Sequence, residues 1–335
     1  MTSSNSTVSR STVRWGILGT GNIARQFAKG LDELPGTQLA AVGSRTRASA
    51  EAFAKAFGIS TYYPSYEALA ASDVDAVYVA TPHTLHRDNT IMLLKAGKAV
   101  LCEKPFAINH AEAAEMVATA RKRGVFLMEA MWTRFLPHMV RLRELLAEEV
   151  IGELRMLQAD FGFRVDVNPE GRLFNPELGG GALLDVGVYP VALAHALFGP
   201  PTDIKGFANL GATGVDEEAA TLFRHSGGRL ALLSAAIRLN TPQEATLIGE
   251  RGHIRLHSGW WRPSGFTVYR SGADPETVEP PCPLNGYNYE ALEVGRCLRE
   301  GLSESGTMPL DESLAILKTL DALRDQWGLR YPVEA

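Results

Sequence analysis

Over roughly the first third of the chain, short runs of β-branched and other apolar residues alternate with longer stretches of mixed polarity. The intervening stretches repeat apolar residues at helical spacing, and one of them closes at Gly124 as a helix C-cap would. Strands that alternate with helices are typical of βαβ units, so this pattern predicts a parallel, doubly wound sheet. The short β-branched runs are residues 13–18, 39–44, 74–80, 99–103 and 125–130.

The rhythm changes after about residue 150. Apolar runs joined by short glycine-containing links now follow one another, which predicts a large, open and mostly antiparallel sheet. Helical patterns interrupt these runs at 182–199 and close the chain near 287–302 and 310–327, so the second part reads as α+β. The runs are residues 153–163, 217–225, 229–239, 244–249, 253–258 and 265–270.

Three parts of the chain follow from these patterns. Residues 1–12 are polar and predict a disordered arm. Residues 13–134 predict a Rossmann-type nucleotide-binding domain, and residues 135–335 an α+β domain whose C-terminal helix can pack back on the first.

Composition narrows the class of protein. The 335 residues are 45% hydrophobic and 21% charged with a net charge of -5, an ordinary profile for a globular protein of two domains. Lysine and arginine are scattered, so neither nucleic acid nor a membrane is an expected partner. With no apolar signal segment and three cysteines that form no C-x-x-C pattern, we expect a reducing cytoplasm and neither disulfides nor a zinc ribbon.

A glycine-rich turn follows the first predicted strand. Gly19, Gly21 and Ala24 form G-x-G-x-x-A between a strand and a helix, which is the context that a dinucleotide-binding loop requires. Glycines there allow a tight turn and let the backbone approach a pyrophosphate at the helix N-terminus. The loop residues expected to contact the cofactor are Gly19, Thr20, Gly21, Asn22 and Ile23.

The end of the second strand favours NADP over NAD. An acid there would accept the ribose hydroxyls of NAD, but this chain has Ser44 and Arg45. A hydroxyl and a guanidinium can bind a 2′-phosphate, which a carboxylate would repel. The alternative is that Arg45 is only a solvent-exposed residue at the start of a helix.

The stretch "VLCEKPFAIN" places Glu103 and Lys104 where the fourth run leaves the core. A solvated turn is the simple explanation of such a pair. Ligands of doubly wound sheets, however, bind outside the carboxyl ends of the strands. Lys104 could therefore hydrogen-bond a substrate oxygen and stabilise a developing alkoxide. The third run ends at "ATPHTLH", whose Thr81, Pro82 and His86 are expected beside the nicotinamide together with Glu103 and Lys104.

Hydride transfer from an alcohol also needs a base that accepts the hydroxyl proton. No Tyr-x-x-x-Lys pair occurs, and the histidine pairs at 83–86 and 253–257 lack the further ligands of a catalytic zinc site, so no metal is expected. In "GGGALLDVGVY", Asp185 and Tyr189 share one face of an otherwise apolar helix. They are candidate catalytic groups, and a satisfied buried Asp–Tyr pair is the alternative.

These motifs together resemble the Gfo/Idh/MocA oxidoreductases. G-x-G-x-x-A, "ATPHTLH", "EKP" and "GGGALLDVGVY" occur in that order, and the resemblance extends over residues 13–332. "MEAMWTRFLP" and the C-terminal helices look most like the branch of NADP-dependent D-xylose dehydrogenase, dihydrodiol dehydrogenase and glucose–fructose oxidoreductase. "GLRYP" looks like a family tail without a catalytic feature.

The resemblance implies roles for individual residues. Lys104 matches the catalytic lysine of EKP, Asp185 the acid of the glycine-rich helix, and Tyr189 the proton acceptor of this branch. Arg172 falls where the branch often has a cofactor-contacting arginine. His83 stands where asparagine is commoner, and its role stays open.

The implied activity is NADP-dependent oxidation of an aldopyranose at its anomeric carbon to a lactone. Tyr189 would take the hydroxyl proton, Lys104 would orient that oxygen and lower the pKa of the tyrosine, and Asp185 would hold Lys104 or a substrate hydroxyl. A dihydrodiol dehydrogenase, a keto-sugar reductase and a non-catalytic NADP-sensing regulator are alternatives, although a regulator need not keep both lysine and tyrosine. The resemblance also implies a homodimer through the outer sheet face. Candidate substrate contacts are Trp132, Phe163, Arg164, Trp260 and Trp261, together with Asp185 and Tyr189.

Overall fold

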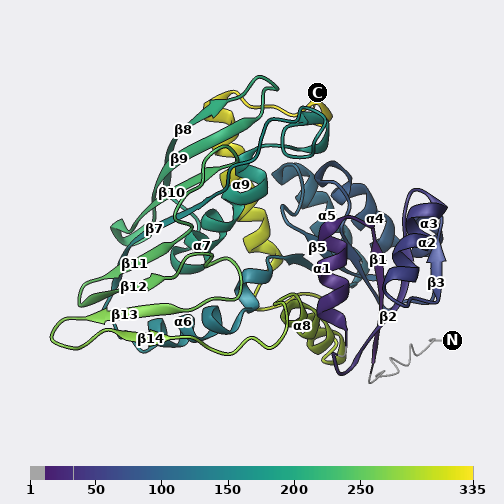
Figure 1. Cartoon of the computed structure of the whole chain (residues 1–335), viewed down its shortest axis with the longest axis horizontal. Coiled ribbons are helices and arrows are strands. Elements are labelled where there is room, and N and C mark those ends of the chain that lie inside the picture. Colours follow the sequence, from purple (N-terminus) through teal and green to yellow (C-terminus); the bar gives the residue numbers. More distant parts are fainter. Residues whose placement is uncertain (1–11, 33, 335) are drawn as a thin grey trace.

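The computed structural model describes residues 12–32 and 34–334. The arm expected at residues 1–12 therefore lies outside the described residues, apart from Thr12. Two sheets dominate the described part of the chain, one on each side of a layer of helices (Figure 1).

Sheet A is the predicted parallel, doubly wound sheet. Its strands run in the order β3-β2-β1-β4-β5-β6, and every recorded pairing between them is parallel. The order reverses between β1 and β4, and such a switch point is where doubly wound sheets bind ligands. The strands are β1 (Val13–Leu18), β2 (Thr37–Gly43), β3 (Thr61–Tyr63), β4 (Ala76–Val79), β5 (Ala99–Glu103) and β6 (Leu127–Ala130).

Helices connect these strands. Asn109 caps α5 by accepting a hydrogen bond from Glu112 N, and Gly124 ends the helix at φ 61°, which confirms the predicted C-cap. The three-residue edge strand β3 escaped prediction because it is too short to show an alternating pattern. The helices are α1 (Asn22–Leu31), α2 (Arg47–Ala56), α3 (Tyr66–Ala70), α4 (His86–Lys95) and α5 (His110–Arg123).

Sheet B confirms the predicted open, mostly antiparallel sheet. Its order is β14-β13-β12-β11-β7-β10-β9-β8, and the β7–β10 pair is parallel. The pattern missed β8, most of whose side chains are exposed or half-buried, and the three-residue β14. The strands are β7 (Leu154–Gly162), β8 (Asp203–Leu210), β9 (Asp216–Arg224), β10 (Leu230–Ala236), β11 (Ala245–Gly249), β12 (Gly252–Leu256), β13 (Phe266–Arg270) and β14 (Glu276–Val278).

The larger helices of the second half lie between the two sheets. In Figure 1, α7 and α9 cover the face of sheet B that looks toward sheet A, and α9 also packs against α5 and β6. No labelled helix covers the opposite face of sheet B in this view. The helices are α6 (Pro137–Ala147), α7 (Val188–Phe198), α8 (Asn288–Arg299) and α9 (Leu310–Trp327). Short 3-10 helices are η1 (His83–Leu85), η2 (Trp132–Phe135), η3 (Pro176–Leu178), η5 (Ser226–Gly228) and η6 (Pro332–Glu334).

The segment before α7 departs from the single helix predicted at 182–199. It opens with a π-helical turn, η4 (Leu183–Gly187), and continues as α7. Residues 176–198 are long and apolar enough to cross a membrane by length and composition, yet 89% of the apolar window is buried inside the protein. Burial in the core therefore accounts for the apolar character of this segment.

Candidate active site

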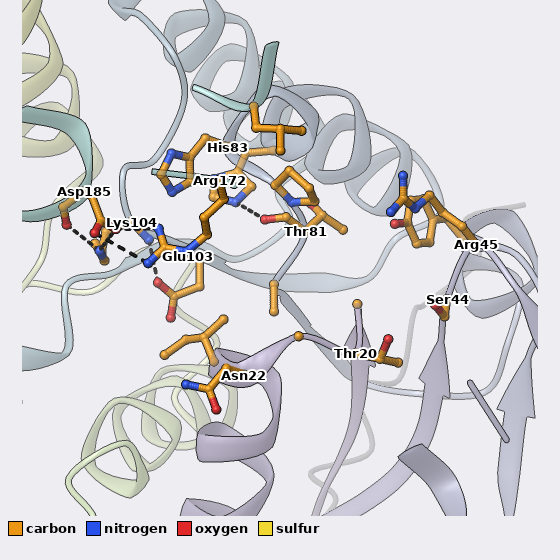
Figure 2. Close-up of a pocket in the computed structure, with 18 of the residues that line it drawn as sticks. Thr20, Asn22, Ser44, Arg45, Thr81, His83, Glu103, Lys104, Arg172 and Asp185 are labelled. Carbon is orange, nitrogen blue, oxygen red and sulfur yellow. Dashed lines mark hydrogen bonds and ion pairs between the residues drawn. The ribbon is translucent and has the colours of Figure 1, made fainter. Parts of the chain in front are cut away.

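A cavity of 560 Å³ opens at the carboxyl ends of β1, β4 and β5 and extends to η4. It brings together all predicted cofactor contacts with Lys104, Asp185 and Tyr189, whereas Trp132, Phe163 and Arg164 do not line it. Figure 2 shows how these side chains face the cavity from both parts of the chain. The lining residues are Gly19, Thr20, Gly21, Asn22, Ile23, Ser44, Arg45, Tyr66, Ala80, Thr81, Pro82, His83, His86, Glu103, Lys104, Arg172, Leu178, Asp185 and Tyr189.

The glycine turn forms one end of the cavity. Gly19 has φ +106°, and a Cβ there would lie 2.5 Å from Ala80 O, so only glycine fits. A Cβ at Gly21 would meet open space. Gly21 also caps α1 without a side-chain hydrogen bond, and the first turn of α1 carries no acid. The N–H groups of this helix end remain available to an anion, which fits a pyrophosphate.

Ser44 and Arg45 lie further along the same wall, between β2 and α2. Ser44 is buried, with its N–H bonded to Tyr63 O at 3.2 Å, while the Arg45 side chain is exposed (Figure 2). Burial raises the pKa of Tyr66, and the positive charge of Arg45 opposes that rise. A hydroxyl, a guanidinium and a phenol thus share this end of the cavity.

Lys104 follows β5 and reaches the opposite wall. The Lys104–Pro105 peptide bond is cis. Lys104 Nζ donates to the backbone oxygen of Asp185 at 2.6 Å and lies 3.5 Å from Asp185 Oδ1. It also lies 5.0 Å from the centroid of the Tyr189 ring. The lysine, the acid and the tyrosine predicted from separate motifs therefore meet in space.

Asp185 is held between two cations. Its Oδ1 accepts from Arg172 Nη1 at 2.7 Å and also lies 3.5 Å from Lys104 Nζ. Burial favours the neutral acid, but the charges of Lys104 and Arg172 prevail and lower the pKa of Asp185 far below its usual range. Asp185 therefore remains a carboxylate and keeps a counter-charge beside Lys104.

Tyr189 is buried, and its hydroxyl accepts a hydrogen bond from Trp132 Nε1 at 3.0 Å. Burial raises its pKa well above 10, with further contributions from Tyr287 and Glu103. Burial therefore outweighs the lowering that the Lys104 ammonium is expected to give, and the pKa of Tyr189 lies above its ordinary value. The Lys104 ammonium faces the ring and hydrogen-bonds to the backbone oxygen of Asp185.

The two histidines of "ATPHTLH" have structural partners. His83 Nδ1 donates to Gly179 O at 3.0 Å, and burial lowers the pKa of His83 to about 3. The sequence left the role of His83 open, although its place in this loop pointed to the cavity. The ring nitrogens of His86 lie 2.9 Å from Pro105 O and 3.0 Å from Thr81 O, so this side chain braces both loops.

An aromatic cluster surrounds Tyr189. Trp132 stacks on Tyr287 at 4.1 Å, and Phe161 and Trp261 lie within 6.2 Å of the Tyr189 ring, centroid to centroid. Sequence reasoning missed Tyr287 and Phe161, because only the tertiary fold brings them here. Among the other candidate substrate contacts, the Arg164 side chain is 54% exposed and ion-paired with Asp166, and Trp260 is fully buried. The Phe163 ring lies 6.3 Å from the Phe161 ring, centroid to centroid, and does not line the cavity.

A switch-point cavity with a glycine turn on a parallel sheet is typical of the dinucleotide-binding oxidoreductases. Family models give the same result: "Oxidoreductase family, NAD-binding Rossmann fold" matches residues 13–131, and "GFO/IDH/MocA C-terminal domain" matches residues 139–255. The chain belongs to the Gfo/Idh/MocA oxidoreductase family, as its motifs predicted.

Curated relatives are dehydrogenases. The trans-1,2-dihydrobenzene-1,2-diol dehydrogenase of Xenopus tropicalis is 39% identical over 95% of this chain and 99% of its own length. The enzyme of the same name from Mus musculus is 39% identical over 96% of this chain and 98% of its own. Together with the family model, these relatives identify the chain as an oxidoreductase of the dehydrogenase type.

Solved structures agree. A 3-ketoreductase from Actinomadura kijaniata, crystallised with NADP and TDP-benzene, is 28% identical, with a TM-score of 0.83 over 94% of this chain and 97% of its own. An aldose-aldose oxidoreductase from Caulobacter crescentus, complexed with glycerol, is 26% identical, with a TM-score of 0.84 over 93% of this chain and 96% of its own.

Proposed function

We propose that this protein transfers hydride between NADP and a CH–OH group of a cyclic sugar or diol, with an aldopyranose oxidised at its anomeric carbon as the first candidate. The observation that carries the proposal is the meeting of Lys104, Asp185 and Tyr189 at one wall of a cavity whose other end is the glycine turn. Residues 13–134 would hold the cofactor and residues 135–335 the substrate.

The cavity supports NADP as the cofactor. The glycine turn leads to the N-terminus of α1, which has no side-chain cap and can face the pyrophosphate, and Ser44 with Arg45 offers a hydroxyl and a cation for a 2′-phosphate. The 3-ketoreductase from Actinomadura kijaniata was crystallised with NADP. When bound, the nicotinamide supplies the acceptor or donor of the hydride, and the protein supplies placement.

Tyr189 is the proposed proton acceptor in oxidation. As the substrate C–H bond gives up its hydride, the phenolate takes the proton of the hydroxyl group. Lys104 would donate a hydrogen bond to the same substrate oxygen while Asp185, itself held by Arg172, keeps the ammonium in place. Because burial raises the pKa of Tyr189, its neutral form dominates at neutral pH and suits the reverse step, protonation of a carbonyl oxygen. Oxidation should therefore accelerate as pH rises.

Two further substrate classes have support. Several curated relatives are named trans-1,2-dihydrobenzene-1,2-diol dehydrogenase, and the aromatic cluster around Tyr189 could contact an unsaturated ring. The 3-ketoreductase among the solved structures favours a keto-sugar reduced with NADPH. Tyr189 and Lys104 would serve the same proton transfer in each case.

A substrate panel tests the proposal. Pentoses, hexoses and trans-dihydrodiols would be assayed with NADP⁺ and keto-sugars with NADPH, by the absorbance of the reduced nicotinamide. We expect turnover with at least one class, fastest with an aldopyranose. Tight NADP binding without hydride transfer to or from any class would favour the NADP-sensing regulator instead.

We also propose that a second copy of the chain covers the outer face of sheet B. Phe207 is 87% exposed there, and the neighbouring Leu222 and Leu232 are 45% and 42% exposed. An apolar sheet face of this kind commonly marks an interface. Light scattering should give the mass of a dimer, and Phe207→Lys should shift the mass toward a monomer; an unchanged mass would place any interface elsewhere.

A further inference from the structure

The C-terminal segment after α9 lies between the two halves of the active site. We call residues 329–334, from Leu329 to Glu334, the C-terminal strap. In Figure 1 the yellow end of the chain lies beside the teal loop that precedes α7, and η6 contacts η3 in that loop. The motif analysis assigns no catalytic feature to "GLRYP", which makes up most of this segment.

Tyr331 holds a second glycine-rich segment, residues 179–181, which precedes Asp185 and Tyr189 in the sequence. Its side chain is 1% exposed, and its hydroxyl donates to Gly180 O at 2.6 Å. Gly180 is the middle of three consecutive glycines that lead into η4. Because a run of glycines is conformationally free, its path must be set by contacts from outside. The tyrosine hydroxyl supplies one such contact.

The other end of the strap is tied to the lysine loop of the first half. The Glu334 carboxylate accepts from Tyr331 N at 2.9 Å, from Arg324 Nη1 at 2.7 Å and from Asn109 Nδ2 at 2.9 Å. Asn109 is the N-cap of α5. Arg324 is 2% exposed and donates to Ile108 O at 3.3 Å, in the loop that begins at Lys104. The strap thus bonds to the Asn109 side chain, five residues after Lys104, and Arg324 of α9 bonds both to Glu334 and to the backbone oxygen of Ile108.

We propose that the C-terminal strap sets the position of Tyr189 relative to Lys104, and that Tyr331 is a positioning residue for proton transfer. This inference rests on the proposed function of Lys104 and Tyr189. The lysine comes from the end of β5 and the tyrosine from α7, so their relative placement depends on contacts between two parts of the fold. The strap supplies a series of buried and half-buried hydrogen bonds between the segment that follows the lysine and the glycine run that precedes the tyrosine. Displacement of a reacting group by even 1 Å can slow a reaction about a hundredfold.

The test compares two variants that each remove one donor to a glycine carbonyl. Tyr331→Phe removes the bond to Gly180 O, and Trp327→Phe removes the bond from Trp327 Nε1 to Gly206 O, 3.0 Å long and on β8 away from the cavity. We expect similar losses in the urea midpoint. With the best substrate of the panel, kcat should fall about tenfold in Tyr331→Phe with NADP affinity retained, and less than about twofold in Trp327→Phe. Equal kcat values for the two variants would overturn the proposal.

A double variant separates positioning from general weakening. If Tyr331 acts through the Tyr189 hydroxyl, then Tyr331→Phe should change kcat less than about twofold when Tyr189→Phe is already present. A full tenfold loss in that background would contradict the proposal.

Should Tyr331→Phe not fold, Glu334→Gln loosens the same strap and should lower kcat about threefold to tenfold; an unchanged kcat would count against the strap. If Tyr189→Phe alone kept its turnover, the proposed function would fail first. An inactive Tyr189→Phe beside an unaffected Tyr331→Phe would reject only the strap.

Discussion

At the scale of single residues, charge and burial around a few side chains decide what the site can do. Asp185 stays ionised because the positive charges of Lys104 and Arg172 both lie beside its Oδ1. Tyr189 stays neutral because it is buried among aromatic rings. Asp185 thus keeps the ionised form in spite of its burial, while burial makes the phenolate of Tyr189, four positions later, still harder to form than in water.

The preference for NADP over NAD tests the proposed role of Arg45 in binding the 2′-phosphate. Replacing it in Arg45→Ala removes the cation proposed to bind the 2′-phosphate, so kcat/KM for NADP should fall about tenfold to a hundredfold while kcat/KM for NAD stays nearly constant. Arg47→Ala is the matched control, since that guanidinium packs over the Tyr62 ring at 5.7 Å and does not line the cavity. Equal losses with both cofactors in Arg45→Ala would remove Arg45 from the phosphate site.

Removing the hydrogen bond from Trp132 to Tyr189 should change the pH profile of oxidation. This bond favours the phenolate, so it lowers the pKa of Tyr189 against the larger effect of burial, and Trp132→Phe should raise that pKa further. The pH profile of oxidation should then move to higher pH by about half a unit or more. Trp261→Phe is the control, because Trp261 Nε1 donates to Gln243 at 3.2 Å instead. Identical profiles for Trp132→Phe and the unaltered enzyme would show that the bond does not tune the base.

At the scale of elements, pattern reading succeeded where a strand is buried on both faces. The run at 99–103 became β5 with all five residues buried, and 13–18 became β1. It failed for β3 and β8, which are short or largely exposed and so leave no strong apolar pattern. The π-helical turn η4 also escaped, because a helical apolar pattern does not distinguish an α-helical from a π-helical turn.

Asp216 anchors η4, and its protonation should affect stability. Its Oδ2 accepts from Leu183 N at 2.6 Å, and burial raises its pKa to about 7. In the unfolded chain this carboxyl has a pKa of about 4, so between about pH 4 and 7 the folded state binds more protons and its stability falls as pH rises. Relative to the non-titrating Asp216→Asn, the unaltered protein should lose up to about 1.4 kcal/mol of unfolding free energy per pH unit in this window.

Urea unfolding of both proteins at about pH 4.5, 6 and 7.5 measures this difference. Comparing the two proteins cancels the contributions of the other titrating groups, such as His195, whose pKa burial lowers to about 3. A difference in unfolding free energy that does not change with pH would mean that Asp216 is already ionised in the folded protein.

At the scale of the whole molecule, sequence motifs located the cavity but not the contacts that cross it. Each predicted cofactor residue lines the cavity because the carboxyl ends of parallel strands meet at one edge. The raised pKa of Tyr189 could not be predicted because it follows first from burial and then from Tyr287, which lies 98 positions later (287 − 189 = 98) and reaches the site only through the fold. The bonds of Tyr331 and Glu334 likewise join segments with no shared motif.

Tyr189 is the group that we propose exchanges a proton with the substrate, and the proposed function depends most on it. Steady-state oxidation by Tyr189→Phe, with NADP affinity measured in parallel by fluorescence titration, tests this most directly. The variant keeps the ring and loses only the hydroxyl, so kcat should fall about a hundredfold to ten-thousandfold while NADP affinity stays within about twofold. Turnover close to that of the unaltered enzyme would contradict the account, and would assign proton transfer to Asp185 or to water.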